Sequence, residues 1–209
     1  MRKQLFYAFI FIGIIAQFYV LMSNIVLREI ILRKGEVCRF QTAPVDPFDA
    51  FRGQYVALNF NELSNGIRTD TEITGKWCYL QIGTGTNGFS VVERASAKRA
   101  DVQPPYLKVR IRYCSGEYES REDSNGKRIS VATGKYLVYC HLPFNRYYMP
   151  DHLAPEAEKA YLEANRRWGK RDATAAVRIW KGKAVIEDLE IGGMPVREFL
   201  KQGTEKAPF

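Results

Sequence analysis

The chain has 209 residues and a formal net charge of +8, from 31 Lys and Arg against 23 Asp and Glu. Residues 1–34 hold five of those cations and one of the anions, so the other 26 cations and 22 anions leave only +4 on the rest. Such a charge is ordinary for a soluble domain and does not indicate a nucleic-acid partner. The length that follows the N-terminal segment suffices for one domain with a core of its own.

Residues 5–27 form one uncharged and mostly apolar run. At about 1.5 Å of rise per residue, a helix of this length crosses the ~30 Å hydrocarbon core of a bilayer. A secretory signal peptide is the alternative, but it has an apolar stretch of about 7–15 residues and ends in a small-x-small cleavage site. The run shows neither feature, so the sequence predicts a single uncleaved transmembrane helix.

Cations flank the apolar run almost equally, with Arg2 and Lys3 before it and Arg28, Arg33 and Lys34 after it. The bias toward cytoplasmic cations therefore does not decide the orientation by itself. Because the first residues usually dominate, we expect residues 1–4 in the cytoplasm and the folded part outside it. The reversed orientation, with a cytoplasmic domain, is the alternative.

Residues 28–52 contain Pro44 and Pro47, and each proline pushes the residue before it into an extended conformation. We expect an extended, turn-rich juxtamembrane segment here. Residues 54–60 then alternate between two faces, one of which carries Val56, Leu58 and Phe60. This pattern predicts a half-buried strand.

Alternation and β-rich composition predict more strands, at residues 76–82, 88–94, 106–114, 128–131 and 135–141. The clearest alternation is YLKVRIRYC at 106–114, in which apolar and basic residues take turns. The Asn125-Gly126 pair favours a tight hairpin turn between two of these strands.

One helix interrupts the strands. Pro155 suits a first helical position, and the residues at helical spacing after it make one apolar face: Ala157, Ala160, Tyr161, Ala164 and Trp168. Residues 173–180 and 184–191 then form a predicted hairpin, followed by a short segment through Leu200. The predicted class is a β-dominated α+β domain over residues 53–200 with one main helix, preceded by one transmembrane helix and followed by a tail at 201–209.

All four cysteines follow the apolar run: Cys38, Cys78, Cys114 and Cys140. In an oxidising compartment they can pair in three ways, and the alternative is that they are thiols buried in strands. No two are spaced as CxxC, and the only histidines are His141 and His152. We therefore expect no metal site and no cofactor.

The segment from Asp46 to Phe60, DPFDAFRGQYVALNF, resembles the GDYXXLXY family of bacterial membrane-anchored proteins. The motif that names this family falls here on Gly53, Gln54, Tyr55, Leu58 and Phe60. Gln54 stands where the family has Asp, and Phe60 stands where it has Tyr. Residues 145–152, the Glu-rich helix and the hairpin at 182–196 are similar in order and spacing to the C-terminal half of the family. The resemblance spans residues 36–200 and implies an anchored bacterial protein, but it transfers little mechanism because the family is uncharacterised.

The charged residues beside this motif admit two interpretations. Asp46, Asp49 and Arg52 either form a turn and surface ion-pair cluster, worth about 0–1 kcal/mol when exposed, or line a groove where the juxtamembrane segment meets the sheet. The structural interpretation is favoured because turn chemistry accounts for each of these residues and for Gly53.

Signatures of common enzymes are missing from the sequence, including GxSxG, HExxH and GxxxxGK[ST]. Residues 83–88, GTGTNG, fit GxGxxG literally but are not followed by a βαβ unit, so a glycine-rich hairpin loop is expected. Ser23, the serine nearest to the expected position of a signal-peptidase nucleophile, lies inside the apolar run. No residue is therefore assigned a catalytic role.

We expect a single-pass protein of the bacterial inner (cytoplasmic) membrane with a periplasmic interaction or assembly domain. Its expected partners are the lipid bilayer and an integral membrane protein, and not a nucleic acid. One alternative is a membrane-associated hydrolase of the signal-peptidase kind. The other is a module that binds lipid headgroups or an envelope polymer through the cations of residues 106–114 and 166–171.

Overall fold

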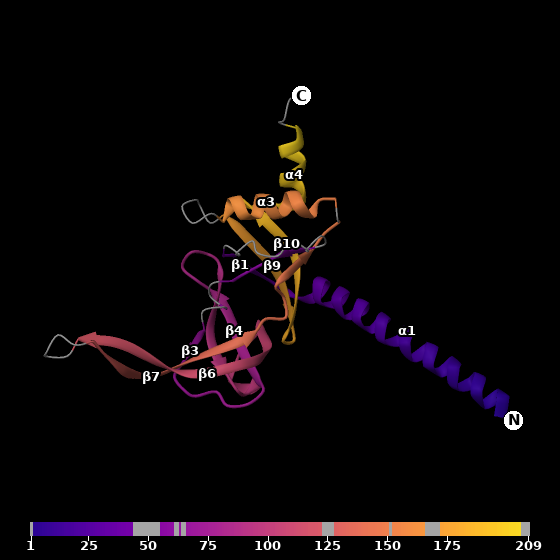
Figure 1. Ribbon diagram of the computed structural model, residues 1–209, viewed down its shortest axis with the longest axis horizontal. Coiled ribbons are helices and arrows are strands. Elements are labelled where there is room, and N and C mark those ends of the chain that lie inside the picture. Colours follow the sequence, from indigo (N-terminus) through magenta and orange to yellow (C-terminus); the bar gives the residue numbers. More distant parts are fainter. Residues whose placement is uncertain are drawn as a thin grey trace.

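The computed structural model describes residues 2–43, 55–60, 63, 66–122, 128–150, 152–165 and 172–205. A long N-terminal helix leads into three antiparallel sheets of four, two and five strands, accompanied by two shorter α-helices. Figure 1 shows the helix projecting away from the sheets, with the N-terminus at its far end. This arrangement confirms the predicted β-dominated α+β class with one long N-terminal helix.

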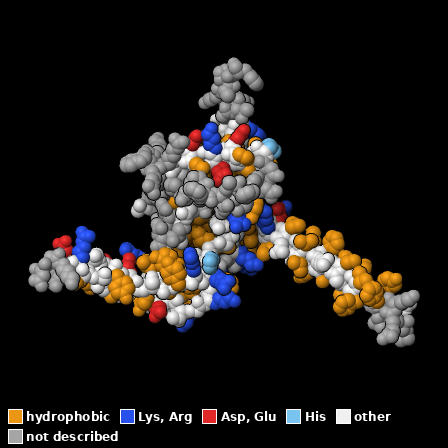
Figure 2. Space-filling model, viewed as in Figure 1, with side chains coloured by type: hydrophobic (Ala, Val, Ile, Leu, Met, Phe, Trp, Pro, Cys, Tyr) orange, Lys and Arg blue, Asp and Glu red, His pale blue; other side chains and the backbone are white. Residues whose placement is uncertain are grey.

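The first helix, α1 (Arg2–Lys34), extends beyond the predicted apolar run at both ends. By length and composition Phe9–Lys34 is able to cross a membrane, as an anchor or a signal sequence, and none of its most apolar window is buried in the protein. Figure 2 shows apolar side chains along the coloured part of the projecting helix. Only its last turns touch the domain, where Ile31 is 3% exposed.

The four-stranded sheet has the order β1-β9-β10-β11, with strands β1 (Glu36–Gln41), β9 (Ala173–Trp180), β10 (Lys183–Ile191) and β11 (Met194–Pro195). The β9–β10 hairpin was predicted, but β1 lies where an extended, turn-rich segment was expected. Its six residues bury only Cys38 and Phe40, so its alternation is too short to be distinctive. A single residue, Gly35, separates β1 from α1.

The five-stranded sheet has the order β3-β7-β6-β4-β5. Its strands are β3 (Ile67–Thr69), β4 (Trp77–Thr84), β5 (Ser90–Ser96), β6 (Tyr106–Glu122) and β7 (Arg128–His141). The two outer strands, β3 and β5, also contact each other, so the sheet curls toward a barrel.

Strands β6 and β7 are longer than the sequence predicts. The alternation in β6 ends at residue 114, yet the strand runs to Glu122 because it keeps pairing with β7. The two strands predicted at 128–131 and 135–141 are one strand, which passes through Gly134 at a φ of 76°. The register of the β6–β7 pair shifts opposite this glycine, between Gly116 and Tyr118. The interrupted alternation near residue 134 therefore reflects a β-bulge within one strand and not a turn between two strands.

The remaining elements cover the ends of the sheets. Strands β2 (Tyr55–Ala57) and β8 (Arg146–Tyr148) pair with each other, and η1 (Arg99–Asp101) is a short 3-10 turn. Helix α3 (Ala154–Ala164) is the predicted helix, although Trp168 lies outside the described residues. Helix α4 (Val196–Glu205) takes up the segment predicted only as a short continuation, and Figure 1 places it beyond α3.

An aromatic cluster joins the sheets in the core. Phe60 lies edge-to-face with Phe40 of β1 and with Phe144, at centroid distances of 6.0 and 5.4 Å, and Phe40 and Phe144 are 5.9 Å apart. Phe60 is 1% exposed. Because the three rings come from distant parts of the sequence, their packing fixes the sheets relative to each other.

We expect Phe60→Ala to lower the free energy of unfolding by about 3–5 kcal/mol, because it empties the centre of this cluster. Phe199→Ala on α4 is the matched control, since Phe199 is already 38% exposed and loses less contact area. Denaturant unfolding of the full chain in detergent, followed by circular dichroism, measures both. Equal losses for the two variants would contradict the central position of Phe60.

Candidate functional site

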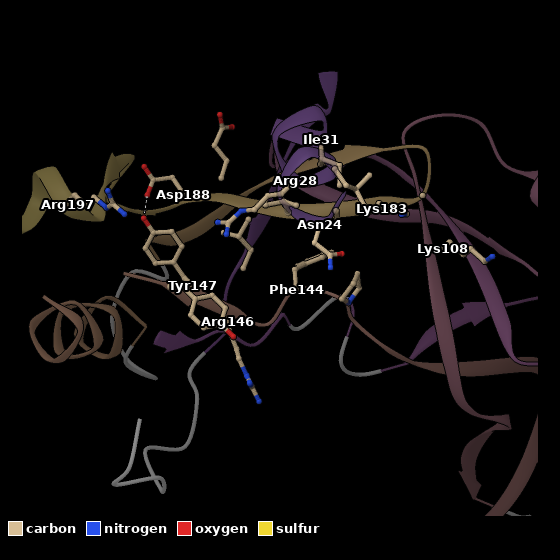
Figure 3. A pocket seen from close by; sticks show the side chains of 18 residues that line it. Asn24, Arg28, Ile31, Lys108, Phe144, Arg146, Tyr147, Lys183, Asp188 and Arg197 are labelled. Carbon is tan, nitrogen blue, oxygen red and sulfur yellow. Dashed lines mark hydrogen bonds between the residues drawn. The ribbon is translucent and has the colours of Figure 1, made fainter. Parts of the chain in front are cut away.

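A pocket of about 770 Å³ opens where α1 meets β10. One wall is a single face of α1, made by residues spaced i, i+3, i+4 and i+7: Asn24, Leu27, Arg28 and Ile31. Residues 182–188, at the start of β10, form the facing wall, and residues 143, 144 and 146–148 around β8 form a third. Figure 3 shows this site, which we call the junction pocket.

Both carboxylates of the junction pocket are already engaged within the domain. Glu187 accepts hydrogen bonds from Nε and Nη2 of Arg178, at 2.7 and 2.8 Å. Asp188 accepts one from the Tyr147 hydroxyl and one from the backbone N–H of Leu189, each at 2.8 Å. Glu187 is therefore paired with a cation that does not line the pocket, whereas the two donors to Asp188 are neutral and leave its charge in place.

The Tyr147 hydroxyl acts as a hydrogen-bond donor and not as a base. Burial raises its pKa, and the hydrogen bond and the charge of Asp188 raise it further, to about 12 against an ordinary value of 10. The charge of Arg197 acts in the opposite direction. The hydroxyl therefore stays protonated at neutral pH and holds Asp188 in place.

Cations outnumber acids in the junction pocket. In the part of the chain that the structure describes, no carboxylate pairs with Arg28 or Lys183. Figure 3 shows Arg28 pointing across the pocket toward Tyr147, with Arg197 at one end and Lys183 and Lys108 toward the other. The Nζ atom of Lys108 lies 4.9 Å from the centre of the Trp77 ring. The pocket therefore carries an excess of positive charge.

A second exposed feature is the distal part of the β6–β7 ribbon, residues 117–122 and 128–135, which we call the hairpin arm. Strand β4 pairs with β6 only over residues 106–110, and β3 pairs with β7 only over residues 136–138. The arm residues therefore pair only with each other among the described strands. Figure 1 shows the arm extending from the sheet on the side opposite α1.

Side-chain contacts attach the base of the hairpin arm to the five-stranded sheet, and the residues farther out are exposed to solvent. Glu117 pairs with Nη2 of Arg68 at 2.6 Å, and its carbonyl accepts a hydrogen bond from the Thr133 hydroxyl at 3.1 Å. Farther out, Tyr118 is 66% exposed on one face, and Ile129 and Val131 are 41% and 37% exposed on the other. The arm thus offers apolar side chains on both faces.

The structure brings together only part of the predicted motif. Five motif positions, namely Asp46, Asp49, Arg52, Gly53 and Gln54, lie outside the described residues. Tyr55 begins β2, and Leu58 and Phe60 are buried in the core. The choice between a turn cluster and a groove at Asp46, Asp49 and Arg52 stays a prediction.

A buried polar network ends β1, just before the motif segment. The Thr42 hydroxyl donates to the Ala173 carbonyl at 2.8 Å and accepts from Nδ2 of Asn165 at 3.0 Å. The Tyr161 hydroxyl, 1% exposed with its pKa raised by burial, donates to the Ala43 carbonyl at 2.8 Å. The sequence analysis assigned Tyr161 to an apolar face and missed this role, which attaches α3 to β1.

All four cysteines are free thiols in the structure. Burial raises the pKa of Cys38 to about 11. Cys140 lies beside Cys78, and their hydrogen bond, with burial, raises the pKa of Cys140. A disulfide among the cysteines stays a prediction. His141 and His152 are exposed, and the described residues contain no group of three or more His, Cys, Asp or Glu able to hold a metal ion.

No local pattern in the sequence indicates the junction pocket. Its lining comes from five separated parts of the chain, and β10 reaches α1 only because β1 pairs with β9. The one local signal was Arg28, the first charge after the apolar run, one helical turn from Asn24 and adjacent to Leu27.

The fold and the pocket together define a β-rich domain carried directly on one long apolar helix. A family model described as GDYXXLXY protein matches residues 17–189, from within α1 to within β10. The chain therefore belongs to the GDYXXLXY family, as the motif residues suggested. Neither the comparison with curated proteins nor the comparison with solved structures gives a match.

We expect Tyr147→Phe to lower the free energy of unfolding by about 1–2 kcal/mol at pH 7, because the hydrogen bond to a charged acceptor is lost. The pH dependence gives a second signature. The folded-state pKa of Tyr147 lies above its unfolded value, so its contribution to stability is complete below pH 10 and is lost as the pH rises toward 12.

Urea unfolding of the full chain between pH 8 and pH 12 measures this contribution as the difference between the two proteins. The gap between wild type and Tyr147→Phe should narrow over that alkaline range. Tyr118→Phe is the control, since its exposed hydroxyl has no described partner. A gap that stays constant with pH would contradict the raised pKa.

Proposed function

We propose that the protein is anchored in the bacterial cytoplasmic membrane by α1, and that its domain, on the periplasmic side, docks onto an integral membrane protein. The hairpin arm carries this proposal. A two-stranded ribbon is marginally stable in water unless something covers it, and this ribbon keeps exposed apolar side chains on both faces. Covering these side chains with a binding partner would remove apolar surface from water.

The junction between α1 and the domain supports a permanent anchor over a cleaved signal sequence. Ile31 of α1 is buried against the domain, and Arg178 donates a hydrogen bond from Nη1 to the Gly35 carbonyl at 3.1 Å. A Cβ at Gly35 would clash with the Ile31 carbonyl, so the junction requires glycine. Cleavage that removed α1 would take away a packed part of the domain.

The edges of the hairpin arm indicate the chemistry of the partner. Backbone N–H and C=O groups along its outer edges have no strand beside them among the described residues. An extended segment can add to such an edge by backbone pairing, while neighbouring side chains provide specificity. We infer that the partner presents an extended periplasmic segment, and the anchor keeps both proteins in one membrane at high effective concentration.

The hydrolase alternative finds no support in the described residues. Among them, Ser96 is the one serine or histidine whose side chain hydrogen-bonds to a carboxylate, that of Asp101. This contact is exposed, and the Ser96 oxygen also accepts the N–H of Lys98, which makes it part of a local turn. It does not line the junction pocket.

A photoreactive residue at position 118, expressed in the full chain in native membranes, tests the docking proposal. We expect one adduct with a different protein that resists alkaline extraction from the membrane, and at least a fivefold loss of that adduct on Ile129→Asp. The same probe at Lys98, exposed on another part of the domain, is the control and should give no such adduct. An adduct between two copies of the chain, or with a soluble protein, would contradict the proposed partner.

The orientation has a separate test in single-cysteine variants of a chain whose four native cysteines are replaced by serine. In spheroplasts, a thiol reagent that cannot cross the membrane should label Lys98→Cys fully and Lys3→Cys hardly at all. The opposite pattern, with Lys98→Cys labelled only after lysis, would place the domain in the cytoplasm.

A further inference from the structure

If α1 spans the membrane as proposed above, the junction pocket lies at the depth of the lipid headgroups. The apolar run of α1 ends at Leu27, and Arg28 is the first charge after it. Both residues line the pocket, together with Asn24 below them and Ile31 above them. The pocket therefore opens at the level where the helix passes from hydrocarbon into the headgroup layer.

The charges of the junction pocket select an anion. Five cations line it against two acids, and one of these acids, Glu187, is paired with Arg178 outside the lining. Arg28 and Lys183 have no acidic partner among the described residues. A guanidinium binds phosphate oxygens through a fork of N–H donors, and an ammonium adds a compact charge. Arg28 on α1 and Lys183 on β10 thus bring both kinds of donor to one pocket from two of its walls.

The volume and the apolar lining of the junction pocket indicate a ligand larger than a free ion. A volume of about 770 Å³ falls in the range of pockets for organic ligands and far exceeds the need of one phosphate. Leu27, Phe144 and Val185 provide apolar surface in the same pocket. A ligand with a phosphate joined to glycerol and the start of an acyl chain matches both kinds of lining.

We propose that the junction pocket binds an anionic phospholipid from the leaflet in which α1 emerges, with Arg28 and Lys183 contacting the phosphate. Bound lipid fills the space between the anchor and β10. It thereby holds the domain at a fixed orientation to the membrane surface, and this orientation sets the direction in which the hairpin arm points.

Thermal unfolding of the detergent-solubilised full chain, with added short-chain phosphatidylglycerol, tests this proposal. A ligand that binds only the folded state raises the melting temperature as its concentration exceeds the dissociation constant. We expect a rise of several degrees with phosphatidylglycerol and at least a tenfold weaker response in Lys183→Gln and in Arg28→Gln. Lys183→Arg should restore the response, and Lys98→Gln, which removes an exposed cation outside the pocket, should behave as wild type.

Three outcomes would overturn the proposal. One is an equal rise with zwitterionic phosphatidylcholine, and another is an equal rise in wild type and Lys183→Gln. The third is an equal rise with inorganic phosphate at the same concentration, which would make the ligand a soluble anion. The readout involves neither the hairpin arm nor a partner protein, so failure here and failure of the docking proposal are distinguishable.

Discussion

The pairing of β1 with β9 is the interaction on which the rest of this structure depends. Its six antiparallel register pairs run from Glu36 with Ile179 to Gln41 with Thr174, and they join the chain just after α1 to its C-terminal hairpin. Because Gly35 alone links α1 to β1, the direction of β1 also fixes the direction of α1. The wall of α1 and the wall of β10 face each other for this reason, and the junction pocket is the space between them.

Two further contacts make that pairing rigid. The ring cluster of Phe40, Phe60 and Phe144 holds β1 to the middle of the chain, and the bonds from Thr42 and Tyr161 fasten its end to β9 and α3. Phe60 is a motif position of the family, and its described role is packing. The buried part of the motif thus stabilises the same strand that follows α1.

Much of the fold was accessible from the sequence because it depends on local patterns. The length and lack of charge of residues 5–27 indicated α1, alternation indicated β4 and the first part of β6, and Pro155 with its apolar spacing indicated α3. The short strands β1 and β3 were missed because six and three residues carry too little periodicity, and tertiary pairing creates them. The full length of β7 was missed because Gly134 resembles a turn signal, while in the structure it accommodates a bulge.

The candidate site was less accessible, for a physical reason. Arg28 and Lys183 are 155 residues apart in the sequence, and their importance comes from lining one pocket in which cations outnumber acids, which no local pattern records. The sequence analysis placed its anionic-ligand alternative on residues 106–114 and 166–171, and only Lys108 of the first range lines the pocket. The second range lies outside the described residues.

The single glycine between helix and sheet has a mechanical consequence. A domain attached through a long linker tumbles independently of its anchor and samples a wide volume above the lipid surface. Here the last turn of the helix is packed into the domain, so helix and domain move as one body. With the helix in a bilayer, as proposed above, the domain would turn only together with its helix about the bilayer normal, and encounter with a partner in the same membrane would depend on lateral diffusion and on that rotation.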